Sequence, residues 1–244
     1  MCTVSVVATP DRSLVRLLVN RDERRLRPMA QPLLLHRTVT GTALWPIDPV
    51  SGGSWIAAND AGLALALLNM NGRRPARGAP SRGAIVPRLA ACRSLDEAVA
   101  HWRSFDTTGF VPFRLVVVER GAVAVFESGV PDPVCLPQAR CHVFSSSSLG
   151  DDLVDGPRRA LLEELLGHEP DAWVAQTRFH QHAWPDRRHL SVMMSRVDAC
   201  TASITELVLS SEDCVMTYRP VVDGWPAGAT TRRIPVATRH ACAA

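Results

Sequence analysis

The chain contains 244 residues, of which 46% are hydrophobic and 21% are charged, a composition typical of a soluble globular protein. All 27 basic residues are arginines, which excludes a Schiff-base lysine, a lysine general base and a Walker-type phosphate loop. The formal net charge of +3 is too small to indicate a nucleic-acid partner or an anionic membrane surface.

The cysteines and the N-terminus bear on the cellular compartment. An odd number of cysteines without a CxxC motif indicates neither a disulfide framework nor a zinc knuckle. The N-terminus lacks the basic and apolar regions of a signal peptide, and no apolar stretch approaches the length of a transmembrane segment. We therefore expect a cytoplasmic protein whose residues 1–244 form a single domain.

Apolar, β-rich runs and turn signals divide the first half of the chain into strand pairs followed by a helical block. Pro10 and Asp60 mark the turns of the two pairs, and Ser94 with Glu97 matches a capping box at the start of a helix. The expected elements are strands at 3–8, 14–20, 54–59 and 63–69, and helices at 83–91 and 94–103.

In the second half, Gly121 marks a hairpin, and Pro157 stands in the first turn of a helix, where its missing N–H is harmless. The expected elements are strands at 113–119, 123–127, 142–146, 190–196, 202–209 and 214–219, and helices at 155–166 and from about 171. This order of strands, helices, strands, helices and strands predicts an α+β fold with antiparallel sheets and helices on the outer faces.

Cys2 follows the initiator methionine directly and opens an apolar run. Methionine is normally trimmed before a small residue, so the mature chain could begin with a cysteine that carries both a thiol and a free α-amine. The unperturbed pKa of such an amine is about 7.7–8.0, close to what a general base needs at neutral pH. Taken alone, Cys2 is better explained as a position that merely tolerates a small residue.

Four polar residues, Asn20 to Glu23, end the second strand abruptly, and Arg27 and Pro28 follow them. Such a cluster is usually a solvated turn at a strand end. The string Asn-Arg-Asp-Glu behind a Leu-rich strand, in a chain that begins Met-Cys, however, resembles the NRDE family. This family is also called the transport and Golgi organisation protein 2 family.

Further segments resemble that family in the same order along nearly the whole chain. The resemblance is specific in the first 70 residues and looser beyond them. The segments are Gly52-Gly53-Ser54-Trp55-Ile56, Asn59, Gly62, Leu68-Asn69, Ser81-Arg82-Gly83, Pro112-Phe113-Arg114-Leu115, the region 144–162, and Thr201-Ala202-Ser203-Ile204-Thr205.

The resemblance implies the fold of N-terminal-nucleophile hydrolases, a four-layer αββα sandwich of two antiparallel sheets. The relatives nearest in plan are conjugated-bile-acid and penicillin V acylases and ceramidase-like amidases. In their cysteine members a cysteine begins the first strand, an arginine and an aspartate end the second, and asparagines on later strands help to form the oxyanion hole. Carried over to this chain, these are Cys2, Arg21, Asp22 and Asn69, with Asn20 and Asn59 as further candidates.

The chemistry gives these residue types a reason. A hairpin places the end of the second strand beside the start of the first, so Arg21 could favour the thiolate and Asp22 could orient the α-amine. Strand register decides which of the two side chains faces Cys2. Asn69 or Asn59 could donate a hydrogen bond to the oxyanion. We expect hydrolysis of an amide or thioester bond in a small or acylated substrate through an acyl-enzyme, without a cofactor or metal.

Two departures from the family pattern affect this prediction. Ser145 to Ser148 replace a segment in which the family has an asparagine, so one oxyanion donor is absent, and Arg114 stands where an asparagine is frequent. Family members have been linked to haem handling and to lipid or acyl-CoA metabolism. A non-catalytic protein that binds or traffics haem or acyl-CoA is therefore the alternative, and a structural protein that lost the chemistry is a third reading.

Three other clusters have simpler interpretations. His180, His182 and His189 could ligate a metal, but no carboxylate or cysteine accompanies them, and a polar loop is the better interpretation. Met193 and Met194 are more typical of core packing than of ligation. The basic run at 73–77, together with Arg82, is usually a solvated surface, but it could bind a carboxylate or the phosphates of an acyl donor.

Overall fold

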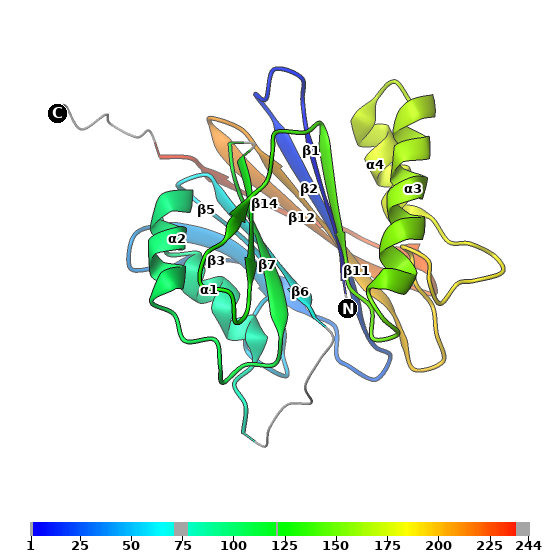
Figure 1. Cartoon of the computed structure of the whole chain (residues 1–244), viewed down its shortest axis with the longest axis horizontal. Helices are drawn as coiled ribbons and strands as arrows, with labels where there is room; N and C mark the ends of the chain where they lie inside the picture. The colour runs from blue at the N-terminus through cyan, green and yellow to red at the C-terminus, as the bar shows by residue number, and fades with distance from the viewer. Residues whose placement is uncertain (1, 71–77, 121, 238–244) are drawn as a thin grey trace.

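The computed structural model of the protein describes residues 2–70, 78–120 and 122–237. Two antiparallel sheets lie face to face, and a pair of helices covers the outer face of each sheet (Figure 1). This is the predicted four-layer αββα sandwich of the α+β class.

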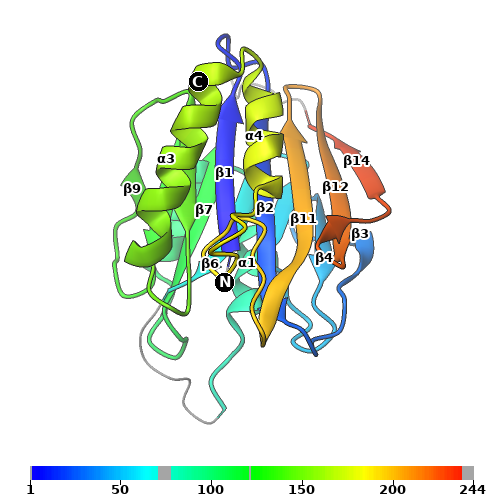
Figure 2. The same ribbon diagram turned by 90° about the vertical axis from the view of Figure 1, so that its right-hand side faces the viewer.

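The first sheet has the strand order β10-β1-β2-β11-β12, with β13 and β14 both paired to β12. Sequence neighbours pair as hairpins, and β10 joins the outer edge of β1 (Figure 2). Its strands are β1 (Cys2–Ala8), β2 (Val15–Arg24), β10 (Cys141–Ser145), β11 (Ala199–Leu209), β12 (Asp213–Val222), β13 (Trp225–Pro226) and β14 (Thr230–Pro235).

The second sheet is a meander in which strands pair in chain order from β3 to β9. Its strands are β3 (Gln31–Arg37), β4 (Thr42–Ile47), β5 (Ile56–Asn59), β6 (Leu63–Asn69), β7 (Phe113–Glu119), β8 (Ala122–Glu127) and β9 (Val134–Cys135).

The helices form the outer layers. The short 3₁₀ helix η1 and helices α1 and α2 cover the second sheet, whereas α3 packs on β10 and α4 lies over β1 and β2 (Figures 1 and 2). Ser94 caps α2 by accepting a hydrogen bond from the N–H of Glu97, as the capping box predicts. The bounds are η1 (Arg82–Ala84), α1 (Ile85–Leu89), α2 (Leu95–Arg103), α3 (Asp152–His168) and α4 (Ala172–Gln181).

Side-chain alternation along β1 explains how the first sheet serves two cores. Val4 and Val6 point between the sheets, where they join the largest apolar cluster. Thr3 and Ser5 point to the other face, toward α3 and α4, and both are fully buried. The layer beneath these two helices is therefore partly polar.

Hydrogen bonds satisfy that buried polar layer. His180 of α4 lies between Ser5 and Asn20, with its two ring nitrogens 2.7 Å from Ser5 Oγ and from Asn20 Oδ1. The Asn20 amide donates to the His180 and Val192 carbonyls, so Asn20 Oδ1 faces the ring and accepts the proton of Nδ1. Burial lowers the pKa of His180 to about 3, and the ring is neutral at pH 7.

The structure corrects one predicted strand and adds five that were not predicted, β3, β4, β9, β13 and β14. Residues 190–196 do not form a strand, because the carbonyls of Ser191 and Val192 accept hydrogen bonds from the side chains of Arg158 and Asn20. The sequence did not predict β3 and β4, which contain prolines at 32 and 46. Within the described residues, no helix is both long and apolar enough to cross a membrane.

Candidate active site

Cys2 begins β1 and lies directly opposite Arg21 of β2 in the strand register. Its side chain is buried at the wall of a cavity of about 730 Å³, which Asp22 and the end of β6, at Asn69, also line. The structure therefore brings four of the six predicted site residues to one cavity. The antiparallel hairpin of β1 and β2 accounts for the pairing of Cys2 with Arg21.

The backbone nitrogen of Cys2 is held by Ser146. In a chain that carries Met1, this nitrogen is an amide N–H, and it donates to Ser146 Oγ at 3.0 Å. The Ser146 N–H in turn donates to the Cys2 carbonyl at 2.9 Å. The serine run that replaces the family asparagine thus supplies a partner for the nitrogen of Cys2, a role that the sequence prediction missed.

Arg21 forms ion pairs with two carboxylates and a cation–π contact with an aromatic ring. Its guanidinium forms ion pairs with Asp48 and, at 3.2 Å, with Glu23. The same group lies over the indole of Trp55, 4.4 Å from the ring centroid. These contacts hold the side chain across from Cys2 and place two carboxylates against its charge.

Asp48 is the acidic centre of this network and was not predicted from the sequence. Arg27 donates two hydrogen bonds of 2.8 Å to its carboxylate, and the N–H of Ser51 donates a third. Burial alone would raise the pKa of Asp48, but these hydrogen bonds and the charge of Arg21 lower it to about 2. Asp48 is therefore ionised at neutral pH.

Asp22 points to the opposite face of β2 from Arg21 and is nearly inaccessible. The hydroxyl of Thr201, opposite it on β11, donates to its carboxylate at 2.6 Å. Burial raises the pKa of Asp22, while the positive charge of Arg158 acts in the other direction. Register thus answers the question left open above: Arg21 faces Cys2 between the sheets, and Asp22 lies beneath the same strand end.

The thiol of Cys2 is not activated by these neighbours. Burial is the largest influence on it and raises its pKa, and the charges of Asp22 and Glu23 act in the same direction. Arg21 lowers the pKa, as predicted, but it does not outweigh burial. A chain whose Cys2 nitrogen is an amide therefore holds this thiol protonated at neutral pH.

The three candidate asparagines have different environments. Asn69 is half-buried in the cavity of Cys2. Asn20 stands opposite Thr3, toward α4, and does not line the cavity, because its amide holds His180.

Asn59 does not line the cavity either. Its amide donates to the carbonyls of Ala90 and Cys92, and its oxygen accepts the N–H groups of Ala61 and Leu63. The first two bonds tie the β5–β6 turn to the end of α1, and the other two close the turn itself. Neither Asn20 nor Asn59 therefore reaches Cys2.

Two of the motifs found in the sequence meet physically at the cavity wall. The N–H of Ser54 donates to the Gly83 carbonyl at 2.9 Å, and a Cβ on Gly53 would lie only 2.7 Å from Gly83 Cα. Glycine at position 53 allows this close approach. The contact places Trp55 and Arg82 at the same cavity as Cys2.

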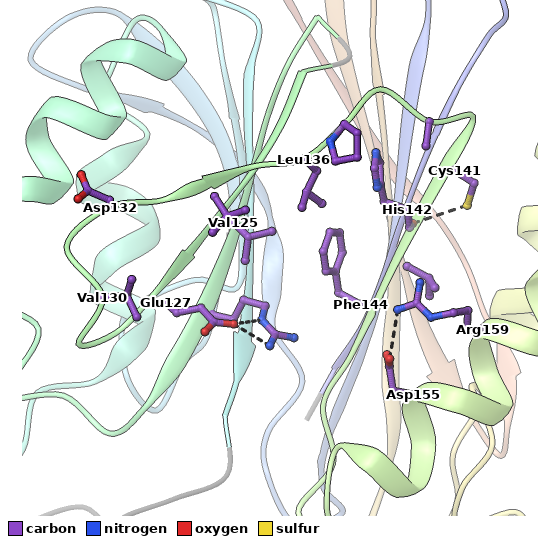
Figure 3. Close-up of a pocket in the computed structure, with 15 residues that line it drawn as sticks. Val125, Glu127, Val130, Asp132, Leu136, Cys141, His142, Phe144, Asp155 and Arg159 are labelled. Carbon is purple, nitrogen blue, oxygen red and sulfur yellow. Dashed lines mark hydrogen bonds and ion pairs between the residues drawn. The ribbon is translucent and has the colours of Figure 1, made fainter.

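A second cavity, of about 650 Å³, lies at the edge of the sandwich and does not include Cys2. Val125 of β8 and Phe144 of β10 point into it from the two sheets, together with Leu136, which follows β9 (Figure 3). Its two arginines are paired: Arg114 with Glu127 at 2.7 Å, and Arg159 with Asp155 at 3.1 Å. Arg114, one of the departures from the family pattern, therefore belongs to this cavity.

The remaining sequence candidates are distributed as follows. Among residues 2–70, 78–120 and 122–237, no three histidines, cysteines or carboxylates cluster as a metal site would require. Met193 and Met194 are buried, as core packing predicts. The basic run at 73–77 lies outside the described residues.

Comparison with solved structures shows which known folds share this arrangement. A cysteine-to-alanine mutant of the conjugated bile acid hydrolase from Clostridium perfringens is 12% identical, with a TM-score of 0.54 over 96% of this chain and 92% of the other. The Caenorhabditis elegans ortholog of N-acylethanolamine-hydrolyzing acid amidase is 13% identical, with a TM-score of 0.54 over 84% and 92%. An arginine-to-leucine variant of the clostridial hydrolase is 12% identical, with a TM-score of 0.53 over 98% and 100%.

At these identities the similarities establish the fold alone, and it is that of the N-terminal-nucleophile hydrolases. No curated protein matches the sequence. The family model described as Transport and Golgi organisation 2 matches residues 1–177, which include every residue of the Cys2 cavity except Asp198 and Ala199. With most of its length covered by that model, and with the fold and the strand-end residues that the resemblance implied, the chain belongs to the Transport and Golgi organisation 2 family.

Proposed function

We propose that this protein is an N-terminal cysteine hydrolase that cleaves an amide or thioester bond of a small or acylated substrate through an acyl-enzyme on Cys2. The observation that carries the proposal is the convergence of Cys2, Arg21, Asp22 and Asn69 on one cavity. Two proteins that share the fold are named as hydrolases of bile acid conjugates and of N-acylethanolamines. These names support amide chemistry as the first activity to test.

Removal of Met1 would supply the missing base. The nitrogen that now donates to Ser146 would become an α-amine, which can accept the thiol proton where an amide cannot. The buried carboxylate of Asp22 would stabilise the ammonium that forms. The raised pKa of Cys2 makes this step necessary, because Arg21 alone leaves the thiol protonated.

The reaction then follows two half-steps. The sulfur attacks the carbonyl carbon while the α-amine takes the thiol proton, and the oxyanion accepts a hydrogen bond from Asn69. Collapse of this intermediate breaks the C–N or C–S bond, and the leaving group takes the proton from the α-ammonium. Water then attacks the thioester, which releases a carboxylic acid and restores the thiol. One oriented oxyanion donor contributes roughly 3–4 kcal/mol to such a step.

The proposal is tested on purified, untagged protein by intact mass and by turnover of a panel of N-acyl amides and acyl thioesters. We expect loss of Met1, hydrolysis of at least one substrate class, and no hydrolysis by Cys2→Ala. Cys135→Ala, which changes an exposed thiol on β9, is the matched control and should retain full activity. Retention of Met1 in essentially all molecules, or unchanged turnover in Cys2→Ala, would contradict the mechanism.

A non-catalytic carrier of haem or acyl-CoA is the second candidate, and the protonated, buried thiol of the unprocessed chain favours it. A carrier does not need Met1 to be removed. Titration with haemin should then produce a Soret band at one equivalent, and acyl-CoA should bind without release of free thiol. Absence of binding to both ligands would exclude this candidate.

A further inference from the structure

Arg82 differs from the other buried or half-buried arginines at the Cys2 cavity. Arg21 and Arg27 form ion pairs there with Asp48 and Glu23. Arg82 is half-buried, yet no carboxylate of the described residues lies within 4.0 Å of its guanidinium. Its charge is the one in the interior of this cavity that the described part of the chain leaves uncompensated.

The guanidinium is also held in place. Its Nη1 donates to the Pro112 carbonyl at 2.9 Å, while the 3₁₀ helix η1 and the contact between Gly53 and Gly83 fix its backbone. Among the residues that the structure describes, Nε and Nη2 have no hydrogen-bond partner, so their N–H groups face no acceptor there. A guanidinium with two N–H groups on one edge matches the two oxygens of a carboxylate.

Electrostatics link this group to the thiol. Burial lowers the pKa of Arg82, whereas the negative charge of Glu23, and of Cys2 when it is a thiolate, acts on it in the opposite direction. Arg82 thus remains charged although burial disfavours that charge, and it faces the same cavity as the nucleophile. A bound anion would remove the cost of leaving the charge unpaired.

We infer that Arg82 is the carboxylate-binding residue of this site, and that the substrates are amides or thioesters that carry a carboxylate close to the scissile bond. The inference rests on the proposed function, because it names the substrate class of the same cavity. The second cavity offers no comparable site, since Arg114 and Arg159 are both neutralised by carboxylates of the chain.

Two alkylating reagents of nearly equal size test this inference without a known substrate. Iodoacetate and iodoacetamide both form a bond between sulfur and carbon and release iodide, but only iodoacetate carries a carboxylate. The measured quantity is the ratio of their rate constants at Cys2, obtained by peptide mass spectrometry. Exposed Cys135 provides the ratio for a thiol outside the cavity in the same molecule.

Arg82→Gln should lower the iodoacetate-to-iodoacetamide ratio at Cys2 by roughly three- to tenfold and leave the ratio at Cys135 unchanged. Arg82→Lys, which keeps the charge but lacks the two-N–H edge, should retain more of the ratio than Arg82→Gln and shows whether a loss reflects charge or misfolding. Arg103→Gln removes the same net charge from an exposed ion pair and should have no effect at Cys2.

The outcomes separate the two proposals. Labelling of Cys2 by both reagents, with a ratio that Arg82→Gln does not change, overturns the role of Arg82 and leaves the proposed hydrolase intact. A ratio that falls equally in Arg82→Gln and Arg82→Lys also overturns it. No labelling of Cys2 by either reagent overturns the proposed function, and with it the substrate class.

Discussion

Replacing Asp48 by asparagine should destabilise the fold in a pH-dependent way. The substitution keeps the shape of the side chain but removes the charge that holds Arg21 and Arg27. The ordinary pKa of this carboxyl is 3.8, and in the folded protein it is about 2. The difference between these two values corresponds to about 2 kcal/mol of folding free energy at pH 7.

The sign of the pH dependence follows from the direction of the shift. Because the pKa is lower in the folded state, the ionised carboxylate stabilises the fold above about pH 4, and this contribution disappears as the pH falls toward 2. At pH 3 roughly half of the contribution should remain. Urea denaturation of wild type and Asp48→Asn at pH 7 and pH 3 measures both values.

Asp132→Asn is the matched control, because Asp132 forms an ion pair whose partners are both more than half exposed. An exposed pair of this kind contributes about 0–1 kcal/mol, so this variant should change the free energy of unfolding little at either pH. A difference between wild type and Asp48→Asn below about 0.5 kcal/mol at pH 7, or one that is the same at pH 3, would refute the reasoning.

Two further substitutions test the packing around the site. Gly53→Ala should destabilise the fold by about 1–3 kcal/mol, because the added Cβ would overlap the Gly83 backbone. Gly167→Ala, which has open space around its Cβ, should not destabilise the fold. Thermal denaturation compares the two variants with wild type. Ser5→Ala should cost about 1–3 kcal/mol in urea denaturation, because His180 loses its buried partner at Nε2. Unchanged stability in either Gly53→Ala or Ser5→Ala would show that the neighbouring layer readjusts freely.

The strands that the sequence predicted are those with regular apolar runs bounded by turn residues. β1, β2, β6 and β7 lie within one or two residues of their predicted starts, and in β2 the strand continues four residues past the predicted end. β3 and β4 were missed because prolines interrupt their patterns. Pro32 is tolerated because β3 is an edge strand, and Pro46 lies beyond the two residues through which β4 pairs with β5.

At the site, the sequence predicted the contact made within one hairpin, but it did not predict the contact made between the two sheets. The pairing of Cys2 with Arg21 follows from the β1–β2 hairpin. The contact of Arg21 with Asp48 joins two sheets, and no spacing in the chain signals it. Asn59 illustrates the converse, because an asparagine at a strand end serves a turn as readily as an oxyanion hole.

The distribution of charge around Cys2 fits the proposed mechanism, in which removal of Met1, and not Arg21, would activate the thiol. Asp48 and Glu23 neutralise Arg21, so that side chain can hold a geometry but adds little positive potential at the sulfur. The buried carboxylate of Asp22 acts against a thiolate, yet it would favour a cation at the nitrogen of Cys2. These surroundings thus disfavour an isolated thiolate, but they favour transfer of the thiol proton to an adjacent amine. The Cys2 thiol and a free α-amine on the same residue exist together only after Met1 is removed. Whether Met1 is removed therefore decides between the proposed hydrolase and the alternative binding protein.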